Sequence, residues 1–382
     1  MVRRTGFVLS MLIVLCCMSC MGIANSQSLN DVLSLLKAHV GEEVIKTHIT
    51  NKDMTFNLST QDIMTLKKAG ASDDLLSFMM SGASGEFPFT LDDDYEIHKP
   101  VIHKHLAIFP VFRSTSSPID EYITLDEAQQ AKLIIIKEKS SASVPVVLIR
   151  NKGTKSIYIM AGEIIIGGKQ DRMVSFDIII PPYKEVEVEV RCVEHGRWHG
   201  ETVVFKSGGA VGCKDVRSAL QFKEQQDVWT EVARTCGEVE VETGSGTYGA
   251  ILSSENVEAK SKPFFDVMHS GLTGDGMVGM IVALNGEVVC VDIFANPVFF
   301  EKVREKLLKA YVLDALSTDQ TQTHAPGRSE IIAFFEEMAN AQTAELKRYS
   351  ENCNIEYESD GIIGNESRDK KGDVQHLNLY RK

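Results

Sequence analysis

Apolar residues recur at two different periods along the chain, and the change falls near Gly85. Before this point, short segments carry apolar residues at helical spacing, whereas continuous and alternating apolar runs after it predict β-strands. Residues 173–180 are mostly apolar and residues 186–190 alternate strictly, so we predict a hairpin that turns at residues 181–184. The expected fold class is α+β: a β-rich, sandwich-like domain with peripheral helices, preceded by a small all-α repeat module.

The helical segment contains an internal repeat with an offset of 31 residues, which aligns residues 28–49 with residues 59–80. Each unit reads as two short helices separated by a turn, and Ser59 with Asp62 has the pattern of a helix N-terminus. Two such units bury their apolar stripes against each other, which predicts a four-helix module at residues 28–81. The pattern resembles a short helical repeat found beside varied bacterial envelope domains. We interpret it as a spacer or as a docking module for an envelope protein partner; the alternative is packing onto the larger domain.

A linker is predicted at residues 82–94, and the β-rich domain follows at residues 95–382. The Asn285-Gly286 pair is the strongest turn pattern in the chain and predicts a second hairpin at residues 277–294. Further strands are expected at residues 101–112, 133–137, 144–150, 157–162, 163–166 and 374–380. Helical segments are expected at residues 125–130, 214–234, 298–316 and 330–348.

The first 26 residues have the pattern of a secretory signal peptide. Arg3 and Arg4 precede an apolar run at residues 7–17 that is too short to be a stable membrane span. Small residues at 24–26 favour a cut after the last of them, and a lipoprotein acylated at Cys20 is the alternative. We therefore expect a periplasmic or secreted protein, with membrane contact only through such a lipid anchor.

The formal net charge of the chain is -13, and removal of the leader makes the mature chain two units more negative. A charge of this sign argues against nonspecific binding to nucleic acid or to anionic membranes. Five of the eight cysteines remain after the leader, widely spaced and odd in number, so they form no disulfide framework. Cys213 and Cys236 either pair in an oxidising periplasm or stay buried as free thiols.

Polar residues gather at the ends of the predicted central strands, where binding sites usually lie. Two polar motifs flank the same hairpin, so we expect their side chains to meet at one end of the central sheet. Arginine forms bidentate bonds to carboxylates and phosphates, and tryptophan stacks on rings. The alternative is that the arginines pair with carboxylates inside the protein. The candidate ligand-binding residues are Glu163, Gln170, Arg172, Glu194, Arg197 and Trp198.

Common cofactor and metal motifs are absent from the sequence. Residues 274–279 match the glycine pattern of dinucleotide folds but lead into a hairpin, where a phosphate-binding helix is required. Zinc ligands are available at His103 and His105, or at Cys192, His195 and His199. Residues 192 and 195 point to opposite faces of a strand, however. We therefore expect neither a cofactor nor a metal.

The central motifs resemble a known family. Gly162-Glu163, residues 167–172 and residues 192–198 have the order and spacing of the ARG-and-rhodanese-phosphatase-superfamily-associated domain family. Residues 291–294 and 374–377 are similar to its later markers, so the resemblance covers about residues 90 to 381. The chain departs at Asp171, where the family more often has Asn. The resemblance implies no established activity, and the family name records only an association with ADP-ribosylglycohydrolase and rhodanese-phosphatase proteins.

Two functional interpretations remain open. The first is a non-catalytic envelope binding or adaptor protein that holds a small anionic ligand at the end of the central sheet. The second is an enzyme that acts on a glycosidic or phosphate-bearing, ADP-ribose-like small molecule. Glu163 or Glu194 would then be the acid or base, and Arg172 and Arg197 would clamp the anion. Convergence of these side chains on an open cavity favours a site, and pairing among themselves favours structure.

Overall fold

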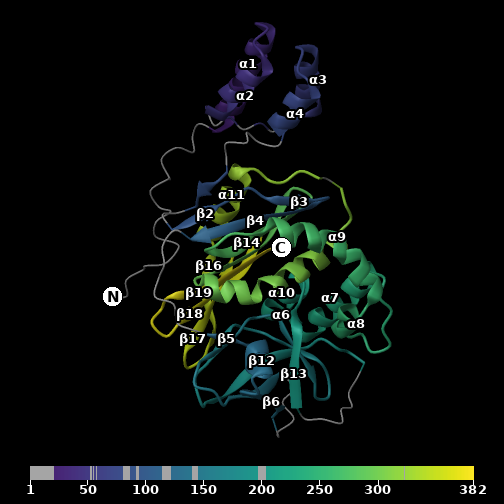
Figure 1. Cartoon of the computed structure of the whole chain (residues 1–382), viewed down its shortest axis with the longest axis vertical. Helices are drawn as coiled ribbons and strands as arrows, with labels where there is room; N and C mark the ends of the chain where they lie inside the picture. The colour runs from purple at the N-terminus through teal and green to yellow at the C-terminus, as the bar shows by residue number, and fades with distance from the viewer. Residues whose placement is uncertain are drawn as a thin grey trace.

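The chain folds into an α+β protein in which helices precede a β-rich part, and this confirms the predicted fold class (Figure 1). The computed structural model describes residues 21–51, 54, 56, 58–80, 87–91, 94–113, 122–139, 145–196, 204–321 and 323–382. The predicted leader lies largely outside these residues, and the predicted cut after residue 26 falls within the first helix.

Four helices at the N-terminal end share a hydrophobic core of their own (Figure 1). The third begins with a capping box in which Ser59 and Asp62 bond to each other's backbone N–H. Across the two sequence repeats, the Glu42 carboxylate accepts the backbone N–H of Ser72 at 2.8 Å and its hydroxyl at 2.5 Å. The helices are α1 (Met21–Lys37), α2 (Glu42–Asn51), α3 (Thr60–Lys68) and α4 (Asp73–Met80).

The largest sheet of the structure is antiparallel and has helices on both of its faces. Helices α9 (Glu255–Gly271) and α10 (Pro297–Leu316) pack on one face, and α11 (Arg328–Ala339) packs on the other. In spatial order the strands are β1 (Phe89–Thr90), β2 (Tyr95–Ile97), β4 (Leu106–Arg113), β14 (Met277–Leu284), β15 (Glu287–Phe294), β19 (Val374–Arg381), β18 (Ile362–Asp369), β17 (Asn352–Glu358) and β16 (Gln342–Arg348), and β3 (Val101–His103) pairs with β4.

The middle of the chain forms a closed barrel and a small three-stranded sheet around a second apolar core. Figure 1 shows α6 (Lys214–Phe222) and α10 between the large sheet and the barrel. The barrel contains β10 (Arg172–Val174), β12 (Glu185–Cys192), β7 (Val146–Asn151), β6 (Ile134–Glu138), β13 (Val204–Val211) and β9 (Glu163–Gly167). The small sheet contains β11 (Ile178–Ile180), β8 (Ile157–Ile159) and β5 (Ile123–Thr124), and α5 (Leu125–Gln130) follows β5.

The predicted strand at residues 173–180 is divided between these two sheets. Its first part, β10, pairs with β12 as expected, whereas β11 pairs with β8. The chain leaves the barrel where Ser175 donates its backbone N–H to the Glu189 carbonyl at 3.0 Å. Asp177 then turns into the protein interior, where it is fully buried. Ser175 and Asp177, the two polar residues of this run, therefore lie where one strand ends and before the next begins.

Three other predictions of secondary structure need correction. The helix predicted at residues 214–234 is two helices, because the chain is extended at Lys223 before a new helix, α7 (Gln225–Glu238), begins. Helix α9, which was not predicted, follows α8 (Tyr248–Leu252). The segment predicted as linker contains β1, and Phe87 packs against Phe109 of the large sheet with ring centroids 5.3 Å apart.

The helix predicted at residues 330–348 ends early. Helix α11 stops at Ala339, and residues 342–348 form the edge strand β16. Strands β17 and β18 were not predicted, because their buried positions hold polar residues and so hide the apolar alternation of a strand. These buried polar positions are Asn352, Asn354, Asn365, Glu366 and Ser367.

The cysteines that remain after the leader are buried free thiols. Cys213 packs with its sulfur 3.7 Å from the Thr235 hydroxyl, and burial raises its pKa to about 12. Cys236 is also free, so these two cysteines do not form a disulfide.

Candidate functional site

The central hairpin brings part of the predicted polar cluster together. Arg172 of β10 lies opposite Cys192 of β12, which places residues 170–172 beside Glu194. The Gln170 amide donates to the Glu194 carbonyl at 2.7 Å, and the Asp171 backbone N–H donates to the Glu194 carboxylate at 3.1 Å. Gln170 and Glu194 are both buried. Arg197 and Trp198 lie outside the described residues.

Arg172 contacts a carboxylate of the barrel. Its guanidinium lies 3.4 Å from Glu138, which also accepts the backbone N–H of Lys169 at 2.9 Å. The same guanidinium lies over the Phe205 ring, 5.5 Å from the centroid. Gly168 has a φ of +55°, and a Cβ there would collide with Phe205. The glycine and the arginine of this motif therefore both pack against Phe205.

Glu163 belongs to a different cluster. Its carboxylate accepts the backbone N–H of Met160 at 3.0 Å and pairs with Lys306 of α10, which also contacts Asp126 at 2.6 Å. Burial raises the pKa of Glu163, and the Lys306 ammonium only partly offsets this effect. Glu163 thus faces α10, while Glu194 accepts hydrogen bonds from the hairpin. The two predicted catalytic carboxylates have separate partners.

A fully buried polar network lies between the large sheet and the barrel. Arg217 of α6 forms a bidentate pair with Asp292 of β15, with nitrogen to oxygen distances of 2.9 and 2.6 Å. His376 of β19 places its Nε2 at 3.0 Å from Asp292 and its Nδ1 at 2.7 Å from Asp177. The Tyr158 hydroxyl donates to Asp177 at 2.6 Å. Arg217 and His376 thus face the carboxylates of Asp177 and Asp292 inside the protein.

The buried charges of this network stabilise one another. Burial raises the pKa of Asp292 and opposes its charge, but Arg217 and His376 outweigh it and hold the pKa well below its usual range. Burial lowers the pKa of His376, and Asp177 and Asp292 more than reverse that effect. Gly162 has a φ of +89°, and a Cβ there would lie 2.8 Å from the Arg217 side chain. The glycine of the Gly162-Glu163 motif therefore makes room for the network.

Sequence reasoning noted the segments that carry Asp292 and His376 but gave these residues no role. The sequence signal that could have identified Asp292 is an aspartate inside the apolar run of residues 287–294. A charged side chain in a buried strand requires a partner. Its partners lie 75 and 84 residues away in the sequence. Periodicity cannot identify contacts of this range.

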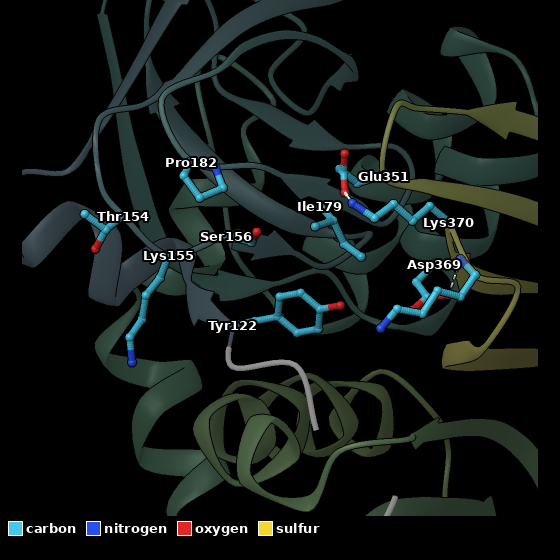
Figure 2. Close-up of a pocket in the computed structure, with 10 residues that line it drawn as sticks. Tyr122, Thr154, Lys155, Ser156, Ile179, Pro182, Glu351, Asp369 and Lys370 are labelled. Carbon is cyan, nitrogen blue, oxygen red and sulfur yellow. Dashed lines mark hydrogen bonds and ion pairs between the residues drawn. The ribbon is translucent and has the colours of Figure 1, made fainter. Parts of the chain in front are cut away.

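A pocket of about 480 Å³ opens beside this network (Figure 2). Its walls come from segments that are distant in sequence, residues 154–156 on one side and residues 369–371 on the other. Tyr122 and Ile179 lie between the two walls, and the Tyr122 hydroxyl points toward the Asp369 side in Figure 2. The lining residues are Tyr122, Thr154, Lys155, Ser156, Ile179, Pro182, Glu351, Asp369, Lys370 and Lys371.

The two carboxylates in the pocket wall already have donors. Glu351 pairs with Lys370 at 2.6 Å, as the dashed line in Figure 2 marks. Asp369 accepts the backbone N–H groups of Lys371 at 2.8 Å and of Asp373 at 2.9 Å. Lys155 also belongs to the lining. Among the described lining residues, three lysines therefore accompany two carboxylates.

The pocket floor is continuous with the buried network. Ile179 donates its backbone N–H to the Asn352 side chain at 3.0 Å, and the same side chain donates to the Asp177 carbonyl at 2.8 Å. Tyr122 packs against Tyr158, with ring centroids 5.5 Å apart. The network thus supports Ile179 and Tyr122, which lie between the two walls of the pocket.

A family model now accounts for most of the chain. The model of the ARG and Rhodanese-Phosphatase-superfamily-associated Protein domain, ARPP-1, matches residues 94–380. The chain belongs to the ARPP-1 family. The ARPP-1 match covers the buried network and the pocket, and it confirms the resemblance seen in the central motifs. Searches of the curated proteins and of the solved structures found no match.

The histidines considered as metal ligands have other contacts in the ARPP-1 region. His103 packs against an aromatic ring of α9, His105 contacts a backbone carbonyl of α10 at 2.9 Å, and His195 packs against Trp229. His199 lies outside the described residues. Among the residues whose positions are described, no group of three or more His, Cys, Asp or Glu side chains is arranged to hold a metal ion. In the same part of the chain, none of the helices has the length and apolar character to cross a bilayer.

Proposed function

We propose that this chain is an exported, non-catalytic binding protein whose ARPP-1 region holds a small anionic ligand in the pocket of Figure 2. The observation that carries the proposal is the described part of the lining, which contains Lys155, Lys370 and Lys371 together with Glu351 and Asp369. Hydroxyl groups of Thr154, Ser156 and Tyr122 offer hydrogen bonds to the rest of a ligand.

The lysines of this lining contrast with the negative net charge of the chain. The chain carries a formal net charge of -13, so most of its surface repels anions. A local excess of lysines in a concave site then attracts an anion to one place, because a concave wall focuses the field of its charges. The volume of about 480 Å³ is in the range of small-molecule sites in proteins.

The enzymatic alternative has less support from the geometry. Glu163 and Glu194 are buried, and each accepts hydrogen bonds from groups of the protein itself. Arg172 pairs with Glu138 and so is engaged within the barrel. These three predicted residues pair off within the protein, which was the pattern expected of a structural cluster. Binding without catalysis is the simpler reading of the pocket.

The proposal is tested by titration calorimetry of the mature chain with inorganic phosphate, glucose 6-phosphate, AMP, ADP-ribose and succinate. We expect at least one of these anions to bind, and Lys371→Met to weaken it about tenfold or more. Lys262→Met is the matched control, because Lys262 is an exposed lysine of α9 that pairs with Asp266 outside the pocket. Binding of none of the five anions, or an equal loss in the control variant, would overturn the proposal.

The proposal also includes export of the chain and docking of its helical module to an envelope protein. The leader pattern at residues 1–26 supports secretion, and intact-mass measurement of protein from the native envelope should give a chain that begins at Gln27. A mass that includes the leader would contradict export, and a lipid-modified Cys20 would favour the lipoprotein alternative. For the helical module, the exposed Val44 and Met64 side chains support docking to an envelope protein.

A further inference from the structure

A group of basic side chains lies at one rim of the barrel, where three turns meet. The Asn151 backbone N–H donates to the Lys184 carbonyl at 2.8 Å, and the Lys152 backbone N–H donates to the Leu133 carbonyl at 2.7 Å. These bonds join the turn after β7 to the turns that precede β12 and β6. The exposed cations on these turns or beside them, which we call the rim cations, are Lys132, Arg150, Lys152 and Lys184.

The Asn151 side chain holds the three turns together from inside. This side chain is fully buried, and its amide donates to the Lys155 carbonyl at 2.8 Å and to the Ile180 carbonyl at 3.1 Å. Its oxygen accepts the Gly153 backbone N–H at 2.8 Å. Side chains that bond to nearby backbone in this way preorganise turns. The backbone that carries the rim cations therefore has one arrangement before any partner binds.

The rim cations do not pair with carboxylates in the part of the chain that the structure describes. The carboxylates of the neighbouring strand β12 pair with other lysines. Glu185 lies 3.6 Å from Lys137, and Glu187 lies 2.6 Å from Lys139. The rim therefore presents four positive charges on a chain whose formal net charge is -13. Such a local excess of one sign marks a surface for a negatively charged partner.

An exposed aromatic ring lies beside the rim cations. Tyr183 is 66% exposed and has a φ of +60°, in a tight turn where the Lys184 backbone N–H donates to the Pro181 carbonyl at 3.3 Å. Large side chains rarely adopt this left-handed conformation, so its presence points to a use for the ring. Tyrosine rings favour the boundary between water and lipid, because the ring is apolar and the hydroxyl is polar.

From this surface we propose that the rim of the barrel docks on an anionic membrane. The rim cations contact the phosphate groups of the lipids, and the Tyr183 ring lies at the level of the headgroups. A membrane fits this surface better than an acidic peptide does. Peptides bind in grooves or along free strand edges, whereas a closed barrel offers no strand edge and the cations are spread over three turns.

The negative net charge of the chain does not prevent this docking. At physiological ionic strength, salt screens exposed charges that lie more than about 8 Å from the lipid surface. Each basic residue close to an anionic surface strengthens binding by about fivefold. Net charge therefore disfavours contact over the whole surface of the protein, while the rim allows contact in one orientation. This docking goes beyond the proposed function, because the rim cations do not line the pocket.

Vesicle flotation tests the proposal with a chain that begins at Gln27 and carries no lipid. We expect this chain to bind vesicles of phosphatidylethanolamine with about 30% phosphatidylglycerol at least tenfold more tightly than phosphatidylcholine vesicles. Lys152→Gln combined with Lys184→Gln should weaken binding to the anionic vesicles about twentyfold, since each lysine contributes about fivefold. Tyr183→Asn suits the left-handed turn and should weaken binding several-fold, whereas Tyr183→Trp should keep it.

A second double variant is the matched control. Lys262→Gln combined with Lys309→Gln removes the same charge from exposed lysines of α9 and α10 that pair with Asp266 and Glu305. Its binding to the anionic vesicles should stay within about twofold of the wild type, because screening limits the effect of distant charges.

Three outcomes would overturn the proposal. The first is absence of binding to the anionic vesicles, or equal binding to the anionic and neutral ones. The second is an equal loss in the two double variants, because net charge and not the rim would then control binding. The third is binding to poly-L-glutamate that depends on Lys152 and Lys184 without binding to vesicles, since the partner would then be an acidic polypeptide.

Discussion

His376 and Asp177 join the last strand of the large sheet to the segment between the barrel and the small sheet. The Nδ1 atom of His376 lies 2.7 Å from the Asp177 carboxylate, and both side chains are fully buried. The His376 ring stacks on Phe294, with centroids 3.9 Å apart and planes inclined by 9°. A buried hydrogen bond between polar side chains constrains the geometry of both partners, so the pair helps to specify how the two sheets are placed.

The first prediction concerns Arg217, which neutralises Asp292 inside this network. Arg217→Met should leave a buried carboxylate without its main cation, which costs about 3 to 5 kcal/mol of unfolding free energy. Arg234→Met is the control, because Arg234 is 39% exposed on α7 and pairs with Asp215 of α6 and Glu231 of α7. Such pairs contribute about 1 kcal/mol or less each. Urea unfolding measures both, and a loss under about 1 kcal/mol for Arg217→Met would contradict a structural role.

The second prediction concerns pH and Asp314. Burial raises the pKa of Asp314 from 3.8 to about 7 in the folded protein. The folded state therefore keeps a proton that the unfolded state releases, and the stabilising contribution present at low pH is lost as the pH rises through about 7. Asp314→Asn keeps an acceptor for the Lys214 backbone N–H and has no charge to bury.

We expect Asp314→Asn to match the wild type near pH 4 and to exceed it at pH 8 by roughly 2 to 4 kcal/mol. Unfolding free energies at the two pH values measure the effect. Asp275→Asn, at an exposed turn, serves as the control and should show no such difference between the two pH values. A difference of the opposite sign for Asp314→Asn would show that Asp314 is ionised and paired in the folded state.

The sequence predicted correctly those strands in which apolar side chains recur at the period of a strand. The hairpin at residues 277–294 is confirmed, with Asn285 and Gly286 at φ values of +51° and +86° in its turn. Strands β17 and β18 were missed because Asn352, Asn365 and other polar residues occupy their buried positions. Asn352 and Asn354 donate to the Asp177 carbonyl, and Asn365 donates to Asn354. These buried polar contacts therefore replace the alternation of apolar residues from which strands are predicted.

The same distinction applies to the site. The hairpin placed Gln170 beside Glu194 because both lie near one short-range strand pair, and this could be read from the turn between them. The pairing of Glu163 with Lys306 spans 143 residues. The pocket joins residues 154–156 to residues 369–371, which are farther apart still. Such contacts depend on the order of strands in the sheets, which no local period encodes.

The third prediction separates structure from binding at the central motif. Arg172 is buried against Glu138 and Phe205, so Arg172→Met should lower the unfolding free energy by about 3 kcal/mol. Its affinity for any anion that binds the wild type should stay within about twofold, because Arg172 does not line the pocket. Chemical unfolding and calorimetry on the same preparation measure the two quantities. A large loss of affinity with unchanged stability would show that the ligand binds at the predicted cluster around Arg172 and not in the pocket.

The last prediction concerns the boundary between the helical module and the ARPP-1 region. The four helices bury their apolar residues in one cluster of their own, and Gly82 and Gly85 favour a cut between the module and Phe87. Limited proteolysis should therefore cleave first at residues 81–86, and a chain beginning at Phe87 should remain folded. We place the boundary at Phe87, before the family match begins at residue 94, because β1 belongs to the large sheet and Phe87 packs on it.

Two shortened chains test that boundary. The chain beginning at Phe87 keeps β1 and the contact with Phe109, whereas a chain beginning at Tyr95 loses both. We expect the second to unfold with a free energy lower by about 1 to 3 kcal/mol, from the lost burial of one aromatic side chain. Equal stability of the two chains would show that β1 adds nothing to the sheet. Failure of the Phe87 chain to fold would make the helical module part of a single core, since the large sheet would then depend on it.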